Sequence, residues 1–268
     1  IIQMLAIAMG GEGRAMMSLE PAFVMYRLIA HMNGLRYISV NLGQDDFSID
    51  LPATLKVIEA QQPAVVFVAN PNNPTGNIHG LDVLRKLAEA APGLLVVDEA
   101  YEPFTDITAL PLLVEYDHVM VMRTVSKMGL AGLRLGYLLG SNMWTDQLEK
   151  VRLPYNINIL TQQATIFALE HLEVFQEQAM QIRADRQKMF AALQAMPALQ
   201  VWRSEANFIL FRAPQGQGAI LHEQLKQQRI LVKSLAGGHP YLEDCLRVTV
   251  GSGEENQQFL EALQHLLH

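Results

Sequence analysis

Two residues with reactive side chains each follow a short apolar segment of the sequence. Lys127 comes shortly after residues 119–122, Val-Met-Val-Met, and Asp98 comes directly after residues 94–97, Leu-Leu-Val-Val. An amine fixed near the end of a strand can bond covalently to an aldehyde, and a carboxylate can pair with a protonated ring nitrogen. These are the two groups that pyridoxal phosphate requires from a protein. The alternative role of Asp98 is a helix cap or an ion-pair partner.

A polar turn lies one predicted strand before Asp98. Residues 70–76 read Asn-Pro-Asn-Asn-Pro-Thr-Gly. Proline fixes φ and asparagine tolerates unusual backbone dihedrals, so the side-chain amides of this segment have set directions. The segment could be no more than a turn. Its position leads us to interpret it as a ligand-binding loop. Tyr101 could bring a phenol to the same place or serve only as a packing aromatic.

Two further groups of residues could bind anions. The hydroxyls of Thr124 and Ser126, with nearby backbone amides, could hold a phosphate, and Arg134 could add a bidentate contact. Arg247 lies inside the apolar segment 246–250, Leu-Arg-Val-Thr-Val. A buried arginine requires an anion. This anion could be a substrate carboxylate or the partner in an internal salt bridge.

The elements that must position these residues alternate along the chain. Short apolar runs predict strands at residues 64–68, 94–97 and 119–122, and a fourth strand is expected at 136–140. Between the first two, residues 80–91 have the apolar spacing of a helix. This order predicts an α/β fold with a mostly parallel central sheet and helices on both faces. The polar clusters would then meet at one edge of the sheet, where such folds bind ligands.

The sequence changes character after Pro154. Residues 161–196 predict one long helix that connects two domains. Strands are expected at 208–211 and 246–250, and helices at 219–228 and 254–267, which together indicate a smaller C-terminal α+β domain. We therefore place a large cofactor-binding domain at residues 1–160, and the connector and small domain at 161–268.

Composition excludes several classes of function. The chain has 268 residues, 50% of them hydrophobic, and a net charge of −7 without a basic cluster, so nucleic-acid binding is not expected. No apolar run approaches the ~20 residues of a membrane span. The single cysteine fits a reducing, cytoplasmic setting, and the scattered histidines give no metal site. Residues 1–9 have the pattern of a helix whose beginning is missing, so we expect the chain to be shortened at its N-terminus.

The motifs occur in an order that resembles the fold-type-I aminotransferases, and among them most closely the histidinol-phosphate aminotransferases. The resemblance covers nearly the whole chain. It is carried by five motifs in order: Asn-Pro-Asn-Asn-Pro-Thr-Gly, Asp-Glu-Ala-Tyr, Thr-x-Ser-Lys, Gly-Leu-Ala-Gly-Leu-Arg-x-Gly and Leu-Arg-Val-Thr-Val-Gly. Relatives carry a flexible arm and a Gly-x-Asp-Glu-like phosphate loop ahead of the first helix. This chain begins where that loop should end.

The resemblance implies how pyridoxal 5'-phosphate would be held. Lys127 would form the Schiff base with the cofactor and move the substrate proton, and Asp98 would pair with the ring nitrogen. The other cofactor contacts that it implies are Asn73 and Tyr101 at the ring hydroxyl, Thr124, Ser126 and Arg134 at the phosphate, and Phe23 stacked over the ring. Relatives usually carry tyrosine at the stacking position, and phenylalanine keeps the aromatic face.

The resemblance also implies the substrate contacts. Arg247 would bind the carboxylate of L-glutamate. Lys233 stands where some relatives use arginine for the substrate phosphate. Lysine can neutralise the charge of that phosphate but cannot make a bidentate contact with it. Tyr155 and Asn158 are similar to an additional pocket segment of the family.

The implied reaction moves an amino group between L-glutamate and imidazole acetol phosphate, a phosphorylated imidazole ketone, in histidine biosynthesis. The implied assembly is a homodimer. Three alternatives remain within the fold: an aromatic amino-acid aminotransferase, a decarboxylase of a phosphorylated amino acid, and a catalytically impaired fragment. A binding protein that kept the fold without catalysis is a fourth, from a different functional class.

Overall fold

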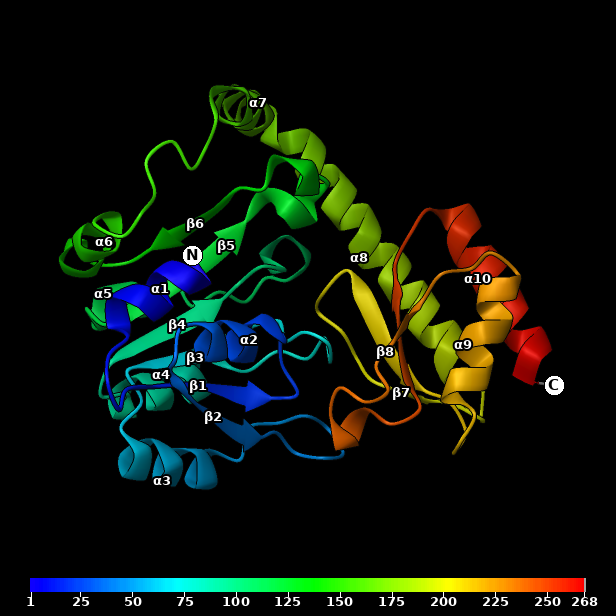
Figure 1. Ribbon diagram of the computed structural model, residues 1–268. Coiled ribbons are helices and arrows are strands. Elements are labelled where there is room, and N and C mark those ends of the chain that lie inside the picture. The colour runs from blue at the N-terminus through cyan, green and yellow to red at the C-terminus, as the bar shows by residue number, and fades with distance from the viewer. Residues whose placement is uncertain (268) are drawn as a thin grey trace.

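The larger of two β-sheets carries the strand ends that the sequence singles out. The computed structural model describes residues 1–267 (Figure 1), and in that range this sheet has the order β2-β1-β3-β4-β5-β6. Its strands are β1 (Ala15–Glu20), β2 (Arg36–Asn41), β3 (Val65–Ala69), β4 (Leu94–Asp98), β5 (Val119–Thr124) and β6 (Gly136–Leu139). Neighbouring strands are parallel except for β5 and β6, which are antiparallel.

Helices cover both faces of this sheet. Alternate residues of β3 belong to different cores, with Val66 and Val68 in one and Val65 and Phe67 in the other. The first core contains residues of α3 (Leu51–Gln61), α4 (Leu81–Ala90) and α5 (Leu112–Glu115). The second contains residues of α1 (Ile2–Met9), α2 (Met25–Met32) and α6 (Asn142–Glu149). Burial on both faces explains the continuous apolar runs, and the predicted α/β fold is confirmed.

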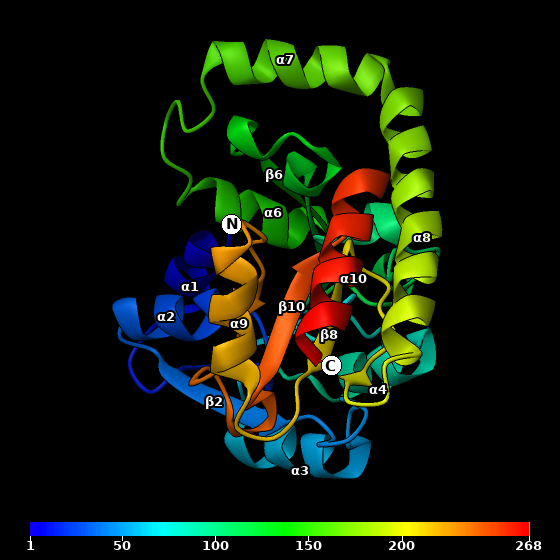
Figure 2. The same cartoon turned by 90° about the vertical axis from the view of Figure 1, so that its right-hand side faces the viewer.

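A second, antiparallel sheet lies in the C-terminal part of the chain (Figure 2). Its order is β7-β8-β10-β9, and its strands are β7 (Gln200–Val201), β8 (Phe208–Arg212), β9 (Lys233–Ser234) and β10 (Cys245–Thr249). The helices α9 (Gly218–Gln227) and α10 (Gly253–Leu267) share a core with this sheet. The two sheets fall on either side of residue 160, so the structure is compatible with the domain division, which stays a prediction.

The expectation of one continuous helix over residues 161–196 is wrong. The segment forms two helices, α7 (Ile159–Glu170) and α8 (Leu172–Gln194), which run in different directions (Figures 1 and 2). The break is at His171, whose φ of −121° and ψ of 37° are not helical. Its ring Nδ1 lies 2.9 Å from the Phe167 carbonyl oxygen at the end of α7. Local polar contacts therefore end α7 where the apolar spacing alone would continue it.

The strands β1 and β2 have weak sequence signals and were not among the predicted strands. β1 reads Ala-Met-Met-Ser-Leu-Glu and contains no β-branched residue, although its first five residues are buried. β2 is an edge strand in which Ile38 and Val40 are buried, while Arg36, Ser39 and Asn41 are exposed. Within residues 1–267 no helix combines the length and the apolar character that a membrane crossing needs.

Candidate active site

Asp98 is the last residue of β4, and its carboxylate is buried at the end of the sheet where the parallel strands have their carboxyl ends. One oxygen, Oδ2, accepts a hydrogen bond of 2.6 Å from the Tyr26 hydroxyl, and Oδ1 accepts one of 3.0 Å from the Ala100 backbone N–H. Burial raises the pKa of Asp98, and these two hydrogen bonds lower it. A positive group placed beside this carboxylate would favour its ionised form.

Tyr26 is a site residue that the sequence reasoning missed. It lies on α2, is fully buried, and stacks on Phe67 with ring centroids 4.7 Å apart. Burial raises the pKa of its phenol, which therefore stays protonated and donates to Asp98. The spacing between Tyr26 and Phe23 could have indicated that Tyr26 belongs to the site. Tyr26 stands three residues after Phe23, and the two rings meet edge to face at 5.7 Å.

Lys127 lies in the short 3₁₀ segment η2 (Val125–Met128), which directly follows β5. Its Nζ is 5.1 Å from the centroid of the Tyr101 ring, and Tyr101 meets Phe208 edge to face. Partial burial, followed by the charge of Arg247, lowers the pKa of Lys127, while Asp98 opposes this shift. The amine is therefore more readily deprotonated than a solvated lysine, as a nucleophilic amine must be.

The loop after β3 is held by its own side chains. Asn70 Oδ1 accepts a hydrogen bond of 2.7 Å from the His79 backbone N–H, and Asn70 Nδ2 donates to the His79 carbonyl. Asn72 Nδ2 donates to the Pro21 carbonyl oxygen at 2.9 Å, which ties this loop to the segment that carries Phe23. Gly76 has a φ of +77°, and a Cβ there would lie 2.5 Å from the Ser204 hydroxyl oxygen. Asn73 therefore has a fixed position.

Arg247 comes from β10 of the second sheet and reaches the same region. One of its terminal nitrogens donates to Asn73 Oδ1, and its guanidinium lies 4.7 Å from the centroid of the Phe208 ring. Its Nε is buried and has no hydrogen-bond partner among the described residues. A buried donor without a partner is unfavourable in the free protein, so an anionic ligand would satisfy it.

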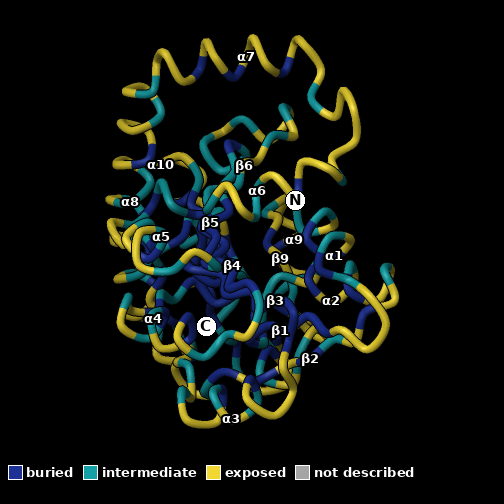
Figure 3. The backbone as a smooth tube through the Cα atoms, turned by 90° about the vertical axis from the view of Figure 1, so that its left-hand side faces the viewer, coloured by how far each residue is buried: buried dark blue, intermediate teal, exposed yellow. Residues whose placement is uncertain are grey.

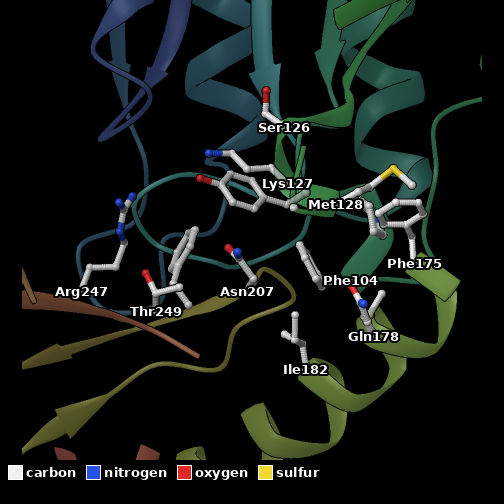
Figure 4. Close-up of a pocket in the computed structure, with 15 residues that line it drawn as sticks. Phe104, Ser126, Lys127, Met128, Phe175, Gln178, Ile182, Asn207, Arg247 and Thr249 are labelled. Atoms are coloured by element: carbon white, nitrogen blue, oxygen red, sulfur yellow. The ribbon is translucent and has the colours of Figure 1, made fainter. Parts of the chain in front are cut away.

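Three cavities meet around these side chains. Lys127, Asp98, Tyr101, Asn73 and Phe23 all line a small cavity of about 60 Å³. Lys127, Tyr101 and Arg247 also line a cavity of about 410 Å³, into which the labelled Lys127 and Arg247 point in Figure 4. A third, of about 360 Å³, is lined by Phe23, Asn73, Lys233 and Arg247. The structure thus brings together residues that the sequence separates by more than 200 positions.

The residues expected to bind a phosphate lie next to Lys127. Thr124 Oγ1 donates to Leu135 O at 2.9 Å, and it lies 2.8 Å from Ser126 Oγ. Ser126 lines the largest of the three cavities. Arg134 is exposed, with a φ of +52°, and its charge helps to lower the pKa of Lys127. Arg134 lines none of the three cavities, so its side chain would have to turn toward the site to contact a ligand there.

Tyr155 and Asn158 lie away from the three cavities, and their role in the substrate pocket stays a prediction. Tyr155 is 96% exposed in the loop before α7, and neither residue lines the three cavities. The Asn158 side chain instead caps α7, because its Oδ1 accepts a hydrogen bond of 2.9 Å from the Thr161 backbone N–H. Helix capping accounts for an asparagine at this position without a ligand.

The sequence and fold define the class of protein. A family model for the class I and II aminotransferases matches residues 1–263. The chain therefore belongs to the class I and II aminotransferases, a family that depends on pyridoxal phosphate.

Within this family, the chain is similar to histidinol-phosphate aminotransferases. Histidinol-phosphate aminotransferase 2 of Nitrosococcus oceani is 52% identical over 264 residues, which are 98% of this chain and 73% of that protein. The crystal structure of the enzyme from Clostridium acetobutylicum superposes with a TM-score of 0.90 at 21% identity, over 99% of this chain and 80% of that one. The enzyme from Sinorhizobium meliloti, solved with pyridoxal-5'-phosphate, gives a TM-score of 0.89 at 24% identity, over 99% of this chain and 73% of that one.

The residues present fit pyridoxal phosphate on two observations. Burial raises the pKa of the Asp98 carboxylate, and no cation within residues 1–267 bonds to it directly, so a protonated ring nitrogen would supply a positive partner. Lys127, an amine with a lowered pKa, lines the same small cavity. A carboxylate and an amine that face one cavity match the two ends of the cofactor ring.

Proposed function

We propose that the chain catalyses amino-group transfer between L-glutamate and imidazole acetol phosphate, with pyridoxal phosphate as the cofactor. The observation that carries this proposal is the small cavity lined by both Lys127 and Asp98, with the buried Nε of Arg247 nearby. The identity of 52% to a histidinol-phosphate aminotransferase supports the choice of substrate.

Pyridoxal phosphate, when bound, supplies an aldehyde for amine exchange and a ring that accepts electron density. The Asp98 carboxylate, oriented by Tyr26, provides the counter-charge that keeps the ring nitrogen protonated. Phe23 covers one side of the small cavity, and Asn73 and Tyr101 provide polar groups at its wall. Thr124 and Ser126, with Arg134, are proposed to bind the cofactor phosphate.

Lys127 is proposed to supply the attaching amine and to transfer the proton. Its Nζ accepts the proton from the substrate carbon that carries the amino group and later returns it. The lowered pKa of Lys127 increases the fraction of free amine near neutral pH, which both tasks require. Because this amine is held next to the cavity, the proton transfer needs no diffusional encounter.

Arg247 is proposed to bind the anionic end of either substrate. Asn73 and Phe208 fix its guanidinium, and its buried Nε is directed to no other acceptor in residues 1–267. The carboxylate of glutamate fits such a group. Lys233, the neighbour of Arg247 across the β9–β10 pair, would help to hold the phosphate of the other substrate.

Side-by-side turnover tests the proposed substrate. We expect the loaded protein to convert histidinol phosphate with 2-oxoglutarate at least ~10-fold more efficiently, in kcat/KM, than phenylalanine. The carboxylate of phenylalanine can pair with Arg247, but phenylalanine has no phosphate for Lys233, and a site built for a polar group discriminates against a ligand that lacks it. Preference for phenylalanine would favour an aromatic aminotransferase. Release of carbon dioxide from a phosphorylated amino acid would indicate the decarboxylase alternative.

We also propose that the chain forms a homodimer in the cytoplasm. α7 projects from the rest of the chain and is mostly exposed (Figure 3). It carries large apolar side chains on its surface, among them Leu160 at 78% and Phe167 at 63% exposure. A helix that is apolar around its circumference favours burial against a partner. Light scattering is expected to give the mass of two chains, and Leu160→Glu is expected to shift it toward one; a wild-type mass of one chain would contradict the proposal.

A further inference from the structure

The cavity of about 360 Å³ contains a cation that none of the roles above uses. Arg27 lies on α2 and lines this cavity together with Lys233 of β9 and Arg247 of β10. β9 and β10 are paired, with Lys233 opposite Arg247. Three positive side chains therefore surround one cavity in a chain whose net charge is −7.

The cavity offers these cations little negative charge in return. In residues 1–267, no carboxylate lies within 4.0 Å of the charged nitrogens of Arg27, Lys233 or Arg247. Glu20 is the acidic residue of the cavity wall. Its two oxygens already accept hydrogen bonds from the Tyr37 hydroxyl and, at 2.8 Å, from the Ala22 backbone N–H. Three cations and one carboxylate line the cavity, so its wall is positive overall and suited to an anion.

The imidazole ring of His239 forms part of the cavity wall and is neutral. Its Nδ1 accepts a hydrogen bond of 3.1 Å from the Tyr241 backbone N–H, so its Nε2 carries the hydrogen and donates to Asn41 Oδ1 at 3.2 Å. Burial lowers the pKa of His239; the charge of Glu20 opposes this shift, and the charge of Arg27 adds a smaller lowering. Arg27 and His239 both line this cavity.

The chemistry of the three cations differs. Arg247 lies deepest, fixed against Asn73 and Phe208 next to Lys127. A single guanidinium is sufficient for a carboxylate, which has two oxygens and one charge. A phosphate monoester has a charge of about −1.5 to −2 and three acceptor oxygens, so it requires further donors. Lys233 supplies a positive charge but no pair of parallel donors. The Arg27 guanidinium supplies both the charge and such a pair.

We propose that Arg27 is a specificity-determining residue that, together with Lys233, binds the phosphate of a phosphate-monoester substrate. This inference rests on the proposed function, because it names a residue that lets the same site distinguish the phosphorylated substrate from glutamate. Arg27 contributes little to glutamate binding, since Arg247 already holds a carboxylate closer to Lys127.

The test compares two substrates in Arg27→Gln. We expect the KM for histidinol phosphate to rise at least ~10-fold, since a charge-assisted hydrogen bond is lost. The KM for glutamate should change less than ~3-fold, because the carboxylate contact is retained. Arg27→Lys should raise the KM for histidinol phosphate less than Arg27→Gln does, because lysine restores the positive charge but not the bidentate contact. Arg14→Gln, which removes an exposed arginine at a different cavity, is the matched control and should change neither value.

A second readout separates this inference from the proposed function. Inorganic phosphate is titrated as a competitive inhibitor of the glutamate reaction, and Arg27→Gln is expected to raise its inhibition constant at least ~10-fold. The role of Arg27 would be overturned if Arg27→Gln left both the KM for histidinol phosphate and the inhibition constant for phosphate unchanged. It would also be overturned if the variant raised the inhibition constant for phosphate and the KM for glutamate by the same factor. Absence of histidinol phosphate turnover in the wild type would instead overturn the proposed function, and phosphate inhibition would still test Arg27. Thermal unfolding checks that each variant is folded.

Discussion

Lys127→Ala is expected to lower the transamination rate at least ~10⁴-fold, the largest effect of any single substitution in this chain. The substitution removes both the amine that bonds to the cofactor and the base that moves the substrate proton. The neighbouring Arg247 and Arg134 cannot replace it, because a guanidinium group has donors only and offers no free amine to bond to the cofactor. Steady-state turnover of glutamate and histidinol phosphate measures the loss.

Covalent labelling gives a readout that does not depend on activity. Borohydride reduction of the wild type with pyridoxal phosphate should add the mass of the cofactor to the peptide that contains residue 127, and Lys127→Ala should lack this label. Lys226→Ala, which removes an exposed lysine paired with Glu223 on α9, is the matched control and should keep both the label and the activity. Retained turnover in Lys127→Ala would refute the assignment.

Asp98→Asn should give the second largest loss, about 10²–10³-fold in kcat. Asparagine keeps the shape of the side chain and removes its negative charge, so a protonated ring nitrogen would lose its counter-charge. Covalent attachment at Lys127 should persist, because the amine is unaffected. The measurement is therefore kcat together with borohydride labelling, and loss of both would indicate a folding defect in place of the expected electrostatic one.

Tyr26→Phe separates the charge of Asp98 from its orientation. Removal of the hydroxyl eliminates one hydrogen bond to Oδ2, so a loss of about 3–10-fold is expected, well below that of Asp98→Asn. This hydrogen bond lowers the pKa of Asp98, so its removal should raise that pKa further. The acid limb of the pH–rate profile should then move to higher pH. An effect equal to that of Asp98→Asn, or a shift to lower pH, would contradict this account.

Local patterns in the sequence were sufficient to predict several strands and the type of chemistry. Apolar runs over residues 94–97 and 119–122 predicted β4 and β5, and the structure confirms these strands, with Asp98 as the last residue of one and Lys127 just beyond the other. Such patterns are local, because a strand that is buried on both faces has apolar residues at successive positions. The class of enzyme was predicted from motif order, and the family match confirms it.

The contacts between residues that are far apart in the sequence became known from the fold. Tyr26 bonds to Asp98 across 72 positions, and Arg247 bonds to Asn73 across 174. No local pattern encodes these pairings, because they depend on strand order and on how the second sheet packs beside the first. The same applies to the end of α7 at His171 and to Asn158, which caps a helix outside the site. Side-chain spacing along the chain specifies an element, whereas contacts between elements are set by the packing of the whole fold.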